Sequence, residues 1–393
     1  MSASPCVAVF NPKTAVMVGF GSSGVAFLSN NVVVKVFWPD DVTLPSAYRQ
    51  GLSHARSEVD CLKDLASKCG GRHVHTLAPG CVPWDPLEVG SDIVVIDNHS
   101  VLPWPDLKSI GRRPHDADSA PDRGYRMAAI ASPYLGPSLK QVELDAATPL
   151  WSVLVKLESV FAMLVRMQEV HATHQDIKAD NCVVGPRCVT LIDCALASDS
   201  RYHAHKRDGW GKVYSFFPLE FVTAEYKVML QWQTVKADKD SEYYNSFVDS
   251  MWTAMFPTLR SRDLSNRTYV FSTVGVDLVH RELLDDRTPD VRSKRRDFVR
   301  ELMTAAEQNN FADEALQMSR VDVFMTGLML LLFLTRTKNY RVEEDRELVC
   351  GIRDLAMRMA EPVCTRRMSA VDAFRVFLTF TSNFKSLFRV EEL

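Results

Sequence analysis

The stretch His174-Gln175-Asp176-Ile177-Lys178-Ala179-Asp180-Asn181 decides how the fold of this chain is interpreted. It lies between an apolar run with helical spacing, residues 153–170, and a short strand-like run, residues 182–184. Asp176 is followed by a lysine two residues later and by an asparagine five residues later. A carboxylate, an ammonium group and an amide at this spacing can hold a hydroxyl nucleophile, a phosphate and a metal ion together. The same residue types are also common on solvated surface loops, so other parts of the chain decide between the two interpretations.

The composition limits the class of protein. The chain has 393 residues, of which 46% are hydrophobic and 24% charged, so it can bury a large core and form two or more units. The net charge of 46 − 49 = −3 gives no electrostatic reason to expect nucleic acid or a membrane surface as a partner. Nine scattered cysteines without a C-x-x-C pair favour a reduced compartment over a disulfide scaffold or a zinc site.

Membrane and export signals are not evident in the sequence. The amino terminus has no basic segment followed by a long apolar run, as a signal peptide would. The most apolar segment, residues 324–334, is too short to span a bilayer and is expected to form a buried helix. We therefore expect an intracellular protein, in the cytoplasm or the nucleus.

A glycine-rich motif, Gly19-Phe20-Gly21-Ser22-Ser23-Gly24, is followed by two β-branched strand patterns joined by a polar turn at residues 29–31. Glycines at this spacing let backbone N–H groups approach phosphate oxygens. A dinucleotide fold would open a helix here, and a Walker loop would place Lys and then Ser or Thr where Val25 and Ala26 stand. The motif therefore predicts a glycine hairpin over a nucleotide, with a plain surface turn as the alternative.

Lys35 lies in the second of these strand patterns, which is otherwise directed to the core. An unpaired ammonium group is costly there, so Lys35 needs an anion. The candidates are Glu58, Asp60 and Asp64, all on a helix expected over residues 53–66. A solvated carboxylate on the helix surface is the alternative for each of them.

These motifs together resemble those of eukaryotic-type protein kinases. The catalytic-loop pattern H-R-D-x-K-x-x-N of that family matches at His174, Asp176, Lys178 and Asn181. The resemblance implies that Asp176 positions a substrate hydroxyl and accepts its proton, while Lys178 neutralises charge on the transferred phosphoryl group. A lysine two residues after the aspartate is the serine/threonine form of this loop. Gln175 stands where the family often has an arginine that clamps a phosphorylated activation segment.

The same resemblance assigns roles in phosphate and metal binding. Lys35 would orient the phosphates of ATP, with Glu58 as the preferred anion that braces it. Residues 191–195 resemble the D-F-G turn of the family, although only Asp193 matches. Asp193 and Asn181 would then hold Mg²⁺ through oxygen ligands.

The segment of residues 132–139 resembles the hinge between kinase lobes, especially as it is written in the casein kinase 1 group. The backbone of Pro133 and Leu135 would bind the adenine edge. Ala26 and Val33 stand where the family usually has Val and Ala, so the two sizes are exchanged and the summed volume of the pocket wall is kept. The complete nucleotide-binding set implied by the resemblance is Gly19, Gly21, Ser22, Ser23, Gly24, Ala26, Val33, Lys35, Pro133, Leu135 and Val183.

Three landmarks downstream also resemble the family. Residues 217–220 resemble the A-P-E end of the activation segment, and Arg367 stands where an arginine would pair with Glu220. Asp322 would hydrogen-bond the backbone of the catalytic loop from the start of a central helix. Residues 223–318 would then be a mostly helical insertion. The basic cluster at residues 292–296 of this insertion is interpreted as a solvated helix face. The alternatives are a binding site for an acidic or phosphorylated partner and a nuclear localisation signal.

The resemblance predicts an α+β, bilobal, protein-kinase-like fold. Residues 1–132 would form a β-rich small lobe with an irregular insertion at 78–123. Residues 133–138 would be the hinge, and residues 139–393 a helical large lobe that contains the insertion at 223–318.

The expected function is transfer of the γ-phosphoryl group of ATP to serine or threonine hydroxyls of a protein, with Mg²⁺ bound. Three alternatives remain: a pseudokinase that binds nucleotide or acts as a scaffold, favoured slightly by the altered Cys194-Ala195 turn and by Gln175; a small-molecule kinase; and a structural interaction protein whose function lies in the insertion. Divergent landmarks with long insertions resemble kinases encoded by large DNA viruses. No nucleic-acid or membrane partner is expected, and the sequence names neither the protein substrate nor the oligomeric state.

Overall fold

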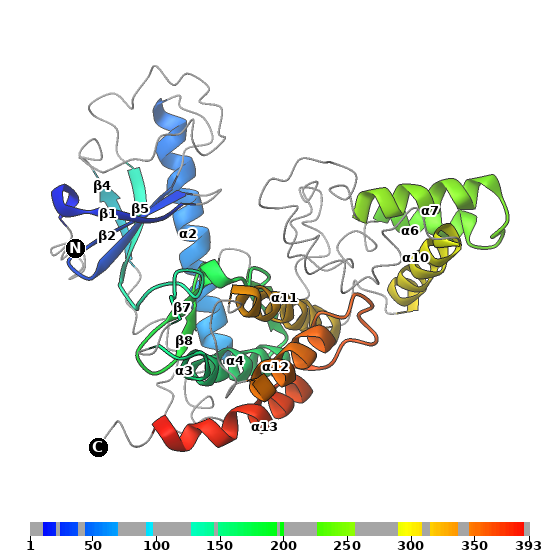
Figure 1. The fold of residues 1–393 in the computed structure, drawn as a ribbon. Coiled ribbons are helices and arrows are strands. Elements are labelled where there is room, and N and C mark those ends of the chain that lie inside the picture. The colour runs from blue at the N-terminus through cyan, green and yellow to red at the C-terminus, as the bar shows by residue number, and fades with distance from the viewer. Residues whose placement is uncertain are drawn as a thin grey trace. The chain divides into compact units, whose positions relative to one another are not determined.

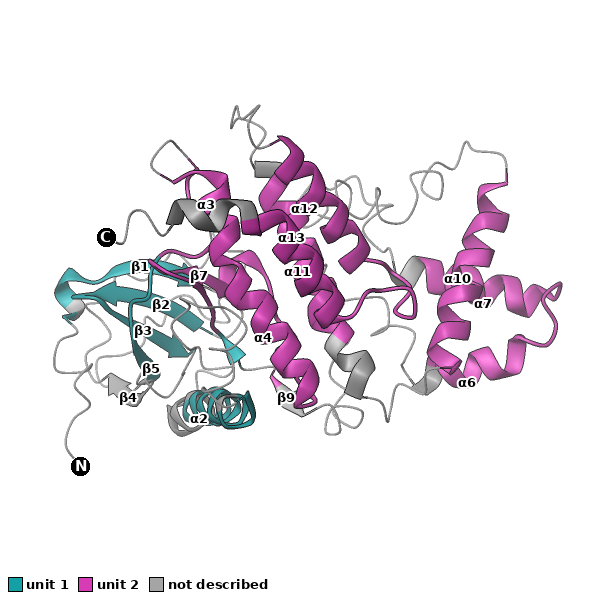
Figure 2. Ribbon diagram, turned by 90° about the horizontal axis from the view of Figure 1, so that it is seen from below, with its two compact units in different colours: residues 1–72, 83–136, 193–196 teal, residues 73–82, 137–192, 197–393 magenta. Residues whose placement is uncertain are grey.

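The computed structural model divides the chain into two compact units, coloured separately in Figure 2. Unit 1 comprises residues 1–72, 83–136 and 193–196, and unit 2 comprises residues 73–82, 137–192 and 197–393. Unit 1 carries a small antiparallel sheet and unit 2 is mostly helical, so the chain is a mixed α+β protein. The structure describes residues 11–20, 24–37, 44–69, 92–96, 127–144, 148–194, 197–199, 226–255, 290–308, 315–336 and 346–388.

Unit 1 is built on a five-stranded antiparallel sheet in the order β1-β2-β3-β5-β4 (Figure 1). Helix α2 packs against β3, β4 and β5. Asn30 and Asn31 close the β2–β3 hairpin in the left-handed region, with φ of 51° and 61°, which asparagine adopts more readily than most residues. The polar turn expected here is confirmed. The bounds are β1 Val16–Phe20, β2 Gly24–Ser29, β3 Val32–Phe37, α2 Leu44–Cys69, β4 Asp92–Ile96 and β5 Met127–Pro133.

Strands β2 and β3 each have one core face and one half-exposed face. Alternate residues of β2 and β3 are buried, and a core of β-branched and aromatic side chains results from this period of two. Gly24 begins β2 so close to β3 that a Cβ there would collide with the carbonyl oxygen of Val36, which explains a glycine at this position. The buried cluster contains Ala15, Val25, Phe27, Val32, Val34, Val36, Ala129 and Ala131.

Unit 2 is organised around helix α11, Ala315–Arg336, whose residues 321–331 are all buried. The buried helix expected over residues 324–334 is confirmed. Gly327 lets α12 approach α11 closely, because a Cβ there would lie 2.7 Å from the carbonyl oxygen of Ala356. None of the helices in the described ranges combines the length and apolar character needed to cross a membrane.

The remaining elements of unit 2 surround α11 or extend from it. Helix α4 and the two-residue strand β6 contact α11 directly and lead into the catalytic-loop stretch. Short hairpins follow, with β7 paired to β8 and β6 paired to β9. The bounds are α3 Leu150–Lys156, α4 Glu158–Glu169, β6 Ala172–Thr173, β7 Cys182–Val184, β8 Val189–Leu191, β9 Ser198–Asp199, α12 Arg346–Met359 and α13 Ala370–Phe388.

Three further helices of unit 2 form a cluster with its own core, which we call the α6–α7–α10 cluster. Its helices are α6 Tyr226–Val235, α7 Glu242–Met255 and α10 Val291–Gln308, all within the range expected to be a helical insertion. Val363, in the segment between α12 and α13, belongs to the same buried set, and Arg366 pairs with Glu301 of α10. The core contains Trp232, Tyr244, Phe247, Val248, Met251, Trp252, Val299, Leu302, Met303, Ala305 and Val363.

Glu307 of α10 predicts an acid-sensitive contact in this cluster. It pairs with Lys236 and accepts hydrogen bonds from Gln233 at 2.9 Å and Trp232 at 3.1 Å, and these partners lower the pKa of Glu307 to about 2. Because the folded-state pKa is below the ordinary value of 4.5, the stabilisation is present above pH 4.5 and is lost as the pH falls towards 2. Because about a third of the Glu307 side chain is exposed, we expect these contacts to add about 1 kcal/mol to the free energy of unfolding.

Chemical unfolding of the wild type and of Glu307→Gln over this pH range checks the prediction. The difference in unfolding free energy between the two proteins should be about 1 kcal/mol at neutral pH and should vanish in strong acid. A difference that stays constant with pH would contradict the assignment.

Candidate functional site

Unit 1 holds Lys35 between two carboxylates. The Nζ atom of Lys35, on β3, lies 2.7 Å from Oε2 of Glu58 on α2 and 3.0 Å from Oδ1 of Asp193. The expected pairing of Lys35 with Glu58 is confirmed, while the rival Asp64 pairs instead with Lys68 at 2.7 Å. Helix α2 is longer than the residues 53–66 expected, and Glu58 lies near its middle. About a fifth of the Lys35 side chain is exposed, so its ammonium group can still reach an incoming anion.

The electrostatics of this cluster reflect its burial. Burial by itself would lower the pKa of Lys35, but the carboxylates of Asp193 and Glu58 outweigh it, so the pKa of the ammonium group is raised. Burial, with the charge of Asp193 adding to it, raises the pKa of Glu58 to about 7 against the opposing effect of Lys35. The ammonium group therefore stays charged, and two acidic groups compete for it.

Unit 2 holds the stretch of residues 174–181. Both carboxylate oxygens of Asp176 accept from Nζ of Lys178, at 2.9 and 2.8 Å, and Oδ2 also accepts from Nδ2 of Asn181 at 2.8 Å. Asn181 donates a further bond, of 2.9 Å, to the backbone oxygen of Asp176. The side chain of Asp176 is 21% exposed, so its carboxylate is partly accessible to solvent. The structure thus brings together the three side chains that the loop motif predicted.

Asp322 of α11 holds the backbone at the start of this loop. Its two carboxylate oxygens accept from the backbone N–H groups of His174, at 2.7 Å, and of Gln175, at 2.8 Å. The expected contact between Asp322 and the catalytic-loop backbone is confirmed. Asp322 is 1% exposed, and this burial raises its pKa to about 7, although the two N–H bonds favour the ionised form.

Two residues of the expected site have left-handed backbone. Gln175 and Asp193 both have φ of 62°, a conformation that costs a residue other than glycine about 1 kcal/mol or more. At Gln175 the conformation is held by the bond to Asp322 and by a 2.8 Å bond from its side chain to Oγ1 of Thr173. Asp193 follows Ile192, whose N–H donates to the backbone oxygen of Asn181 at 3.0 Å. Such strain is typical of functional positions.

The residues expected to bind the nucleotide are only partly within the described chain. Ala26, Val33 and Lys35 lie on the half-exposed face of β2 and β3, opposite the core face, and Ala26 is paired with Lys35 across the two strands. Gly19 and Gly24 are described in β1 and β2. Residues 21–23, and with them Gly21, Ser22 and Ser23, lie outside the described residues.

The hinge and floor residues are described as well. Pro133 ends β5 and Leu135 follows it, both half-buried, while the neighbouring Tyr134 donates its N–H to Asn31 at 2.8 Å. In unit 2, Val183 is 8% exposed and forms an antiparallel bridge with Ser138.

The predicted ion pair of Glu220 with Arg367 falls outside the described residues, because Glu220 does. Arg367 itself is 2% exposed and donates to the backbone oxygens of Glu361, Arg320 and Pro362 at 2.9, 3.0 and 3.3 Å. Its guanidinium also lies 4.7 Å from the ring centre of Phe324 on α11. These contacts give Arg367 a structural role in the segment that joins α12 to α13.

The residues expected to hold Mg²⁺ offer suitable oxygen atoms. The Nδ2 atom of Asn181 donates to Asp176, so its Oδ1 atom is the oxygen that could serve as a metal ligand, and Asp193 has a partly exposed carboxylate. Within the ranges that the structure describes, no group of three or more His, Cys, Asp or Glu side chains could hold a metal ion.

Sequence reasoning missed the direct contact of Lys35 with Asp193. The two residues are 158 positions apart, and no local pattern links them. Comparison with known proteins adds no assignment, because neither a protein-family model nor a curated protein matches the chain.

Proposed function

We propose that the protein is a serine/threonine protein kinase that transfers the γ-phosphoryl group of ATP to a protein hydroxyl. The observation that carries the proposal is the pair of charged clusters. One holds an ammonium group between the buried carboxylate of Glu58 and the partly exposed carboxylate of Asp193, and the other holds a partly exposed carboxylate beside a lysine and an asparagine. Phosphoryl transfer needs both, because it depends on positioning and on neutralising charge.

In the proposed reaction, Asp176 accepts a hydrogen bond from the substrate hydroxyl and takes its proton as the oxygen attacks the γ-phosphorus. A new O–P bond forms, the bond from the γ-phosphorus to the bridging oxygen breaks, and ADP leaves with that electron pair. Lys178, which lies 2.8 Å from Asp176, offers positive charge to the transferred group. Lys35 orients the α- and β-phosphates while Glu58 fixes its position. Bound Mg²⁺, with oxygen ligands from Asn181 and Asp193, would supply further charge neutralisation.

The fold and compartment belong to the same proposal. The antiparallel sheet with α2 and the helical remainder fit the small and large lobes of a protein-kinase-like fold, with the hinge near residue 136. Every cysteine that the structure describes is a free thiol, as expected in a reducing intracellular compartment.

A pseudokinase is the second candidate. The direct bond of 3.0 Å between Lys35 and Asp193 favours it, because each group neutralises the other before any phosphate or metal arrives. Five features count against it: Lys35, Glu58, Asp176, Asn181 and Asp193 are all retained, and a scaffold has no physical need for this set. The small-molecule kinase alternative shares Asp176, Asn181 and Asp193 but gives no role to Lys178.

A thermal-shift titration with ATP, with and without Mg²⁺, tests nucleotide binding. We expect Mg²⁺ and ATP together to raise the unfolding temperature of the wild type, since a ligand at 100 times its Kd stabilises by about 2.7 kcal/mol. Lys35→Met should lose most of this shift, because its ammonium group is the proposed phosphate contact. Lys68→Met is the control: it removes an ion pair between Lys68 and Asp64, both on α2, and should keep the thermal shift. Equal shifts in all three proteins would place nucleotide binding elsewhere.

Treatment with a phosphatase tests regulation. Gln175 is fully buried and bonded to Thr173 and Asp322, so this position offers no cation to a phosphorylated segment. We expect active protein treated with a phosphatase to retain its transfer rate. Loss of transfer after dephosphorylation, restored by rephosphorylation, would show that a phosphorylated segment is needed.

A further inference from the structure

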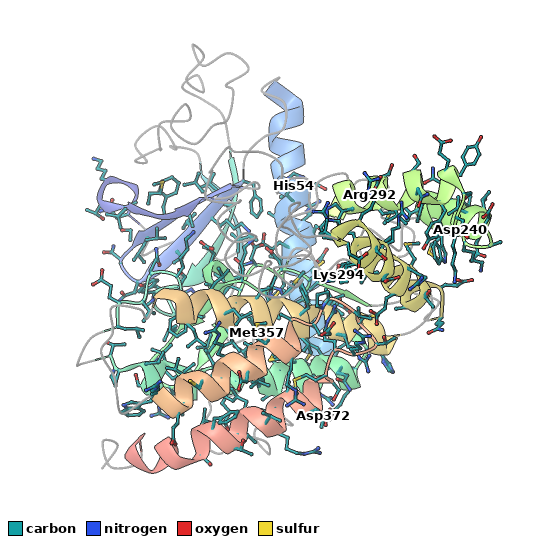
Figure 3. All side chains as sticks on the ribbon, turned by 45° about the vertical axis from the view of Figure 1, so that its right-hand side comes forward. His54, Asp240, Arg292, Lys294, Met357 and Asp372 are labelled. Atoms are coloured by element: carbon teal, nitrogen blue, oxygen red, sulfur yellow. The ribbon has the colours of Figure 1, made fainter. Side chains whose placement is uncertain are left out.

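The first turns of α10 carry a concentrated positive charge. Between residues 291 and 300 there are five basic residues and one acidic residue, so this part of the helix has a charge of 5 − 1 = +4 in a chain whose net charge is −3. Like charges four residues apart destabilise a helix, so this pattern is unfavourable for the helix alone. Figure 3 labels Arg292 and Lys294 on this helix. The basic residues are Arg292, Lys294, Arg295, Arg296 and Arg300.

Three of these arginines share one face of the helix. Arg292, Arg296 and Arg300 are spaced by four residues, which places successive side chains about 6 Å apart along the axis. Arg300 binds Asp297 at 2.5 Å. Within the part of the chain that the structure describes, Arg292 and Arg296 have no ion-pair partner, and Nε of Arg296 is buried without a hydrogen-bond partner. Two guanidinium groups on this face are therefore available to an anion.

A buried hydroxyl lies beside this face. Tyr244 of α7 is 2% exposed, and its Oη atom has no hydrogen-bond partner among the described residues. Burial raises the pKa of Tyr244, and the charged side chains that act on it are those of Arg300, Asp297 and Arg296. A phenylalanine would fill the same core space without leaving a hydroxyl unpaired. The hydroxyl is explained if it donates to a ligand that the arginines also bind.

The chemistry of the site favours a compact dianion. Guanidinium groups bind phosphate oxygens with paired N–H donors, and a tyrosine hydroxyl supplies one more donor. An extended nucleic acid fits less well, because binding of single strands uses free aromatic faces. The ring of Trp252, next to this helix, is already covered by Arg295 at 4.9 Å, and Tyr243 of α7, which is 82% exposed, is a lone stacking surface among the described residues of these two helices. The α6–α7 turn, where Figure 3 labels Asp240, carries three acidic and two basic residues between positions 236 and 242, so it adds no net positive charge for a continuous polyanion.

We propose that α7 and α10 form a binding site for a phosphate monoester carried by a partner protein. Arg292 and Arg296 bind the phosphate oxygens, and Oη of Tyr244 donates to one of them. The site belongs to the α6–α7–α10 cluster, whose core is independent of the catalytic loop. Binding at this site therefore does not depend on the proposed phosphoryl transfer.

Fluorescence anisotropy with the full chain tests this site. The probe is a labelled short peptide of glycine and alanine with one phosphoserine, compared with the same peptide carrying serine. We expect the wild type to bind the phosphopeptide at least about tenfold more tightly than the serine peptide. Arg292→Gln/Arg296→Gln should weaken phosphopeptide binding by about tenfold or more. Arg353→Gln/Arg358→Gln, which removes two exposed arginines from α12, should leave binding unchanged.

Tyr244→Phe gives the sharper readout. It should weaken phosphopeptide binding by several-fold, about the effect of one lost hydrogen bond, without lowering the unfolding temperature. Asp176→Asn should bind the phosphopeptide as the wild type does, which separates this site from catalysis. Equal binding of the two peptides, unchanged binding in the α10 double variant, or tighter binding of a single-stranded RNA oligonucleotide would overturn the proposal.

Discussion

Asp176→Asn is expected to reduce phosphoryl transfer by about a hundredfold to ten-thousandfold, the usual contribution of a general base. The asparagine keeps the size of the side chain and one oxygen acceptor for Lys178 and Asn181, so the loop should hold its shape. It loses the negative charge that accepts the proton of the substrate hydroxyl. Transfer rates of purified wild type and variant, measured with radiolabelled ATP under identical conditions, check the prediction.

Two controls make this comparison specific. The unfolding temperatures of the two proteins, and their stabilisation by ATP with Mg²⁺, should agree closely, since Lys35, the proposed phosphate contact, is unchanged in the variant. Asp180 is four residues after Asp176, and its exposed carboxylate pairs with Lys140. The variant Asp180→Asn should therefore retain full transfer. Wild-type rates in a clean Asp176→Asn preparation would remove Asp176 from the proposed role.

Asp322→Ala is expected to destabilise the protein by about 3 kcal/mol and to reduce transfer with it. The carboxylate of Asp322, which is 1% exposed, accepts hydrogen bonds from two backbone N–H groups. Each buried N–H group left without a partner costs about 1–3 kcal/mol. The same bonds hold Gln175 in its left-handed conformation. Without them the loop loses the backbone geometry that presents Asp176.

Chemical unfolding measures the loss of stability. The matched variant Asp322→Asn separates the loss of stability from the loss of transfer. The asparagine retains an oxygen acceptor for one of the two N–H groups, so it should lose less stability than the alanine while still impairing transfer. Full stability in Asp322→Ala would show that the loop backbone is held by other contacts.

The sequence predicted much of the local structure because hydrophobic spacing and turn chemistry act over a few residues. The β2–β3 hairpin followed from β-branched runs on either side of Asn30 and Asn31, and the buried helix followed from the apolar run 324–334. The pairing of Lys35 with Glu58 and the contact of Asp322 with the loop came from the family resemblance. Both are found in the structure.

Other features depended on contacts between distant parts of the chain and could not be predicted. The core of the α6–α7–α10 cluster joins Trp232 of α6 to Val363, which follows α12. Arg367 turned out to satisfy three backbone oxygens, a role that no charge pattern indicates. The unpaired hydroxyl of Tyr244 is likewise visible only once α7 and α10 are packed together. Such features arise from tertiary packing, which the order of residues along one segment does not encode.

Incubation of the wild-type protein with γ-labelled ATP and Mg²⁺, together with generic acidic and basic protein substrates, tests the central claim most directly. Label is expected on serine or threonine hydroxyls, labelling should require Mg²⁺, and Asp176→Asn should not produce it. Protein that is stabilised by ATP and Mg²⁺ but labels neither itself nor any added protein would contradict the account.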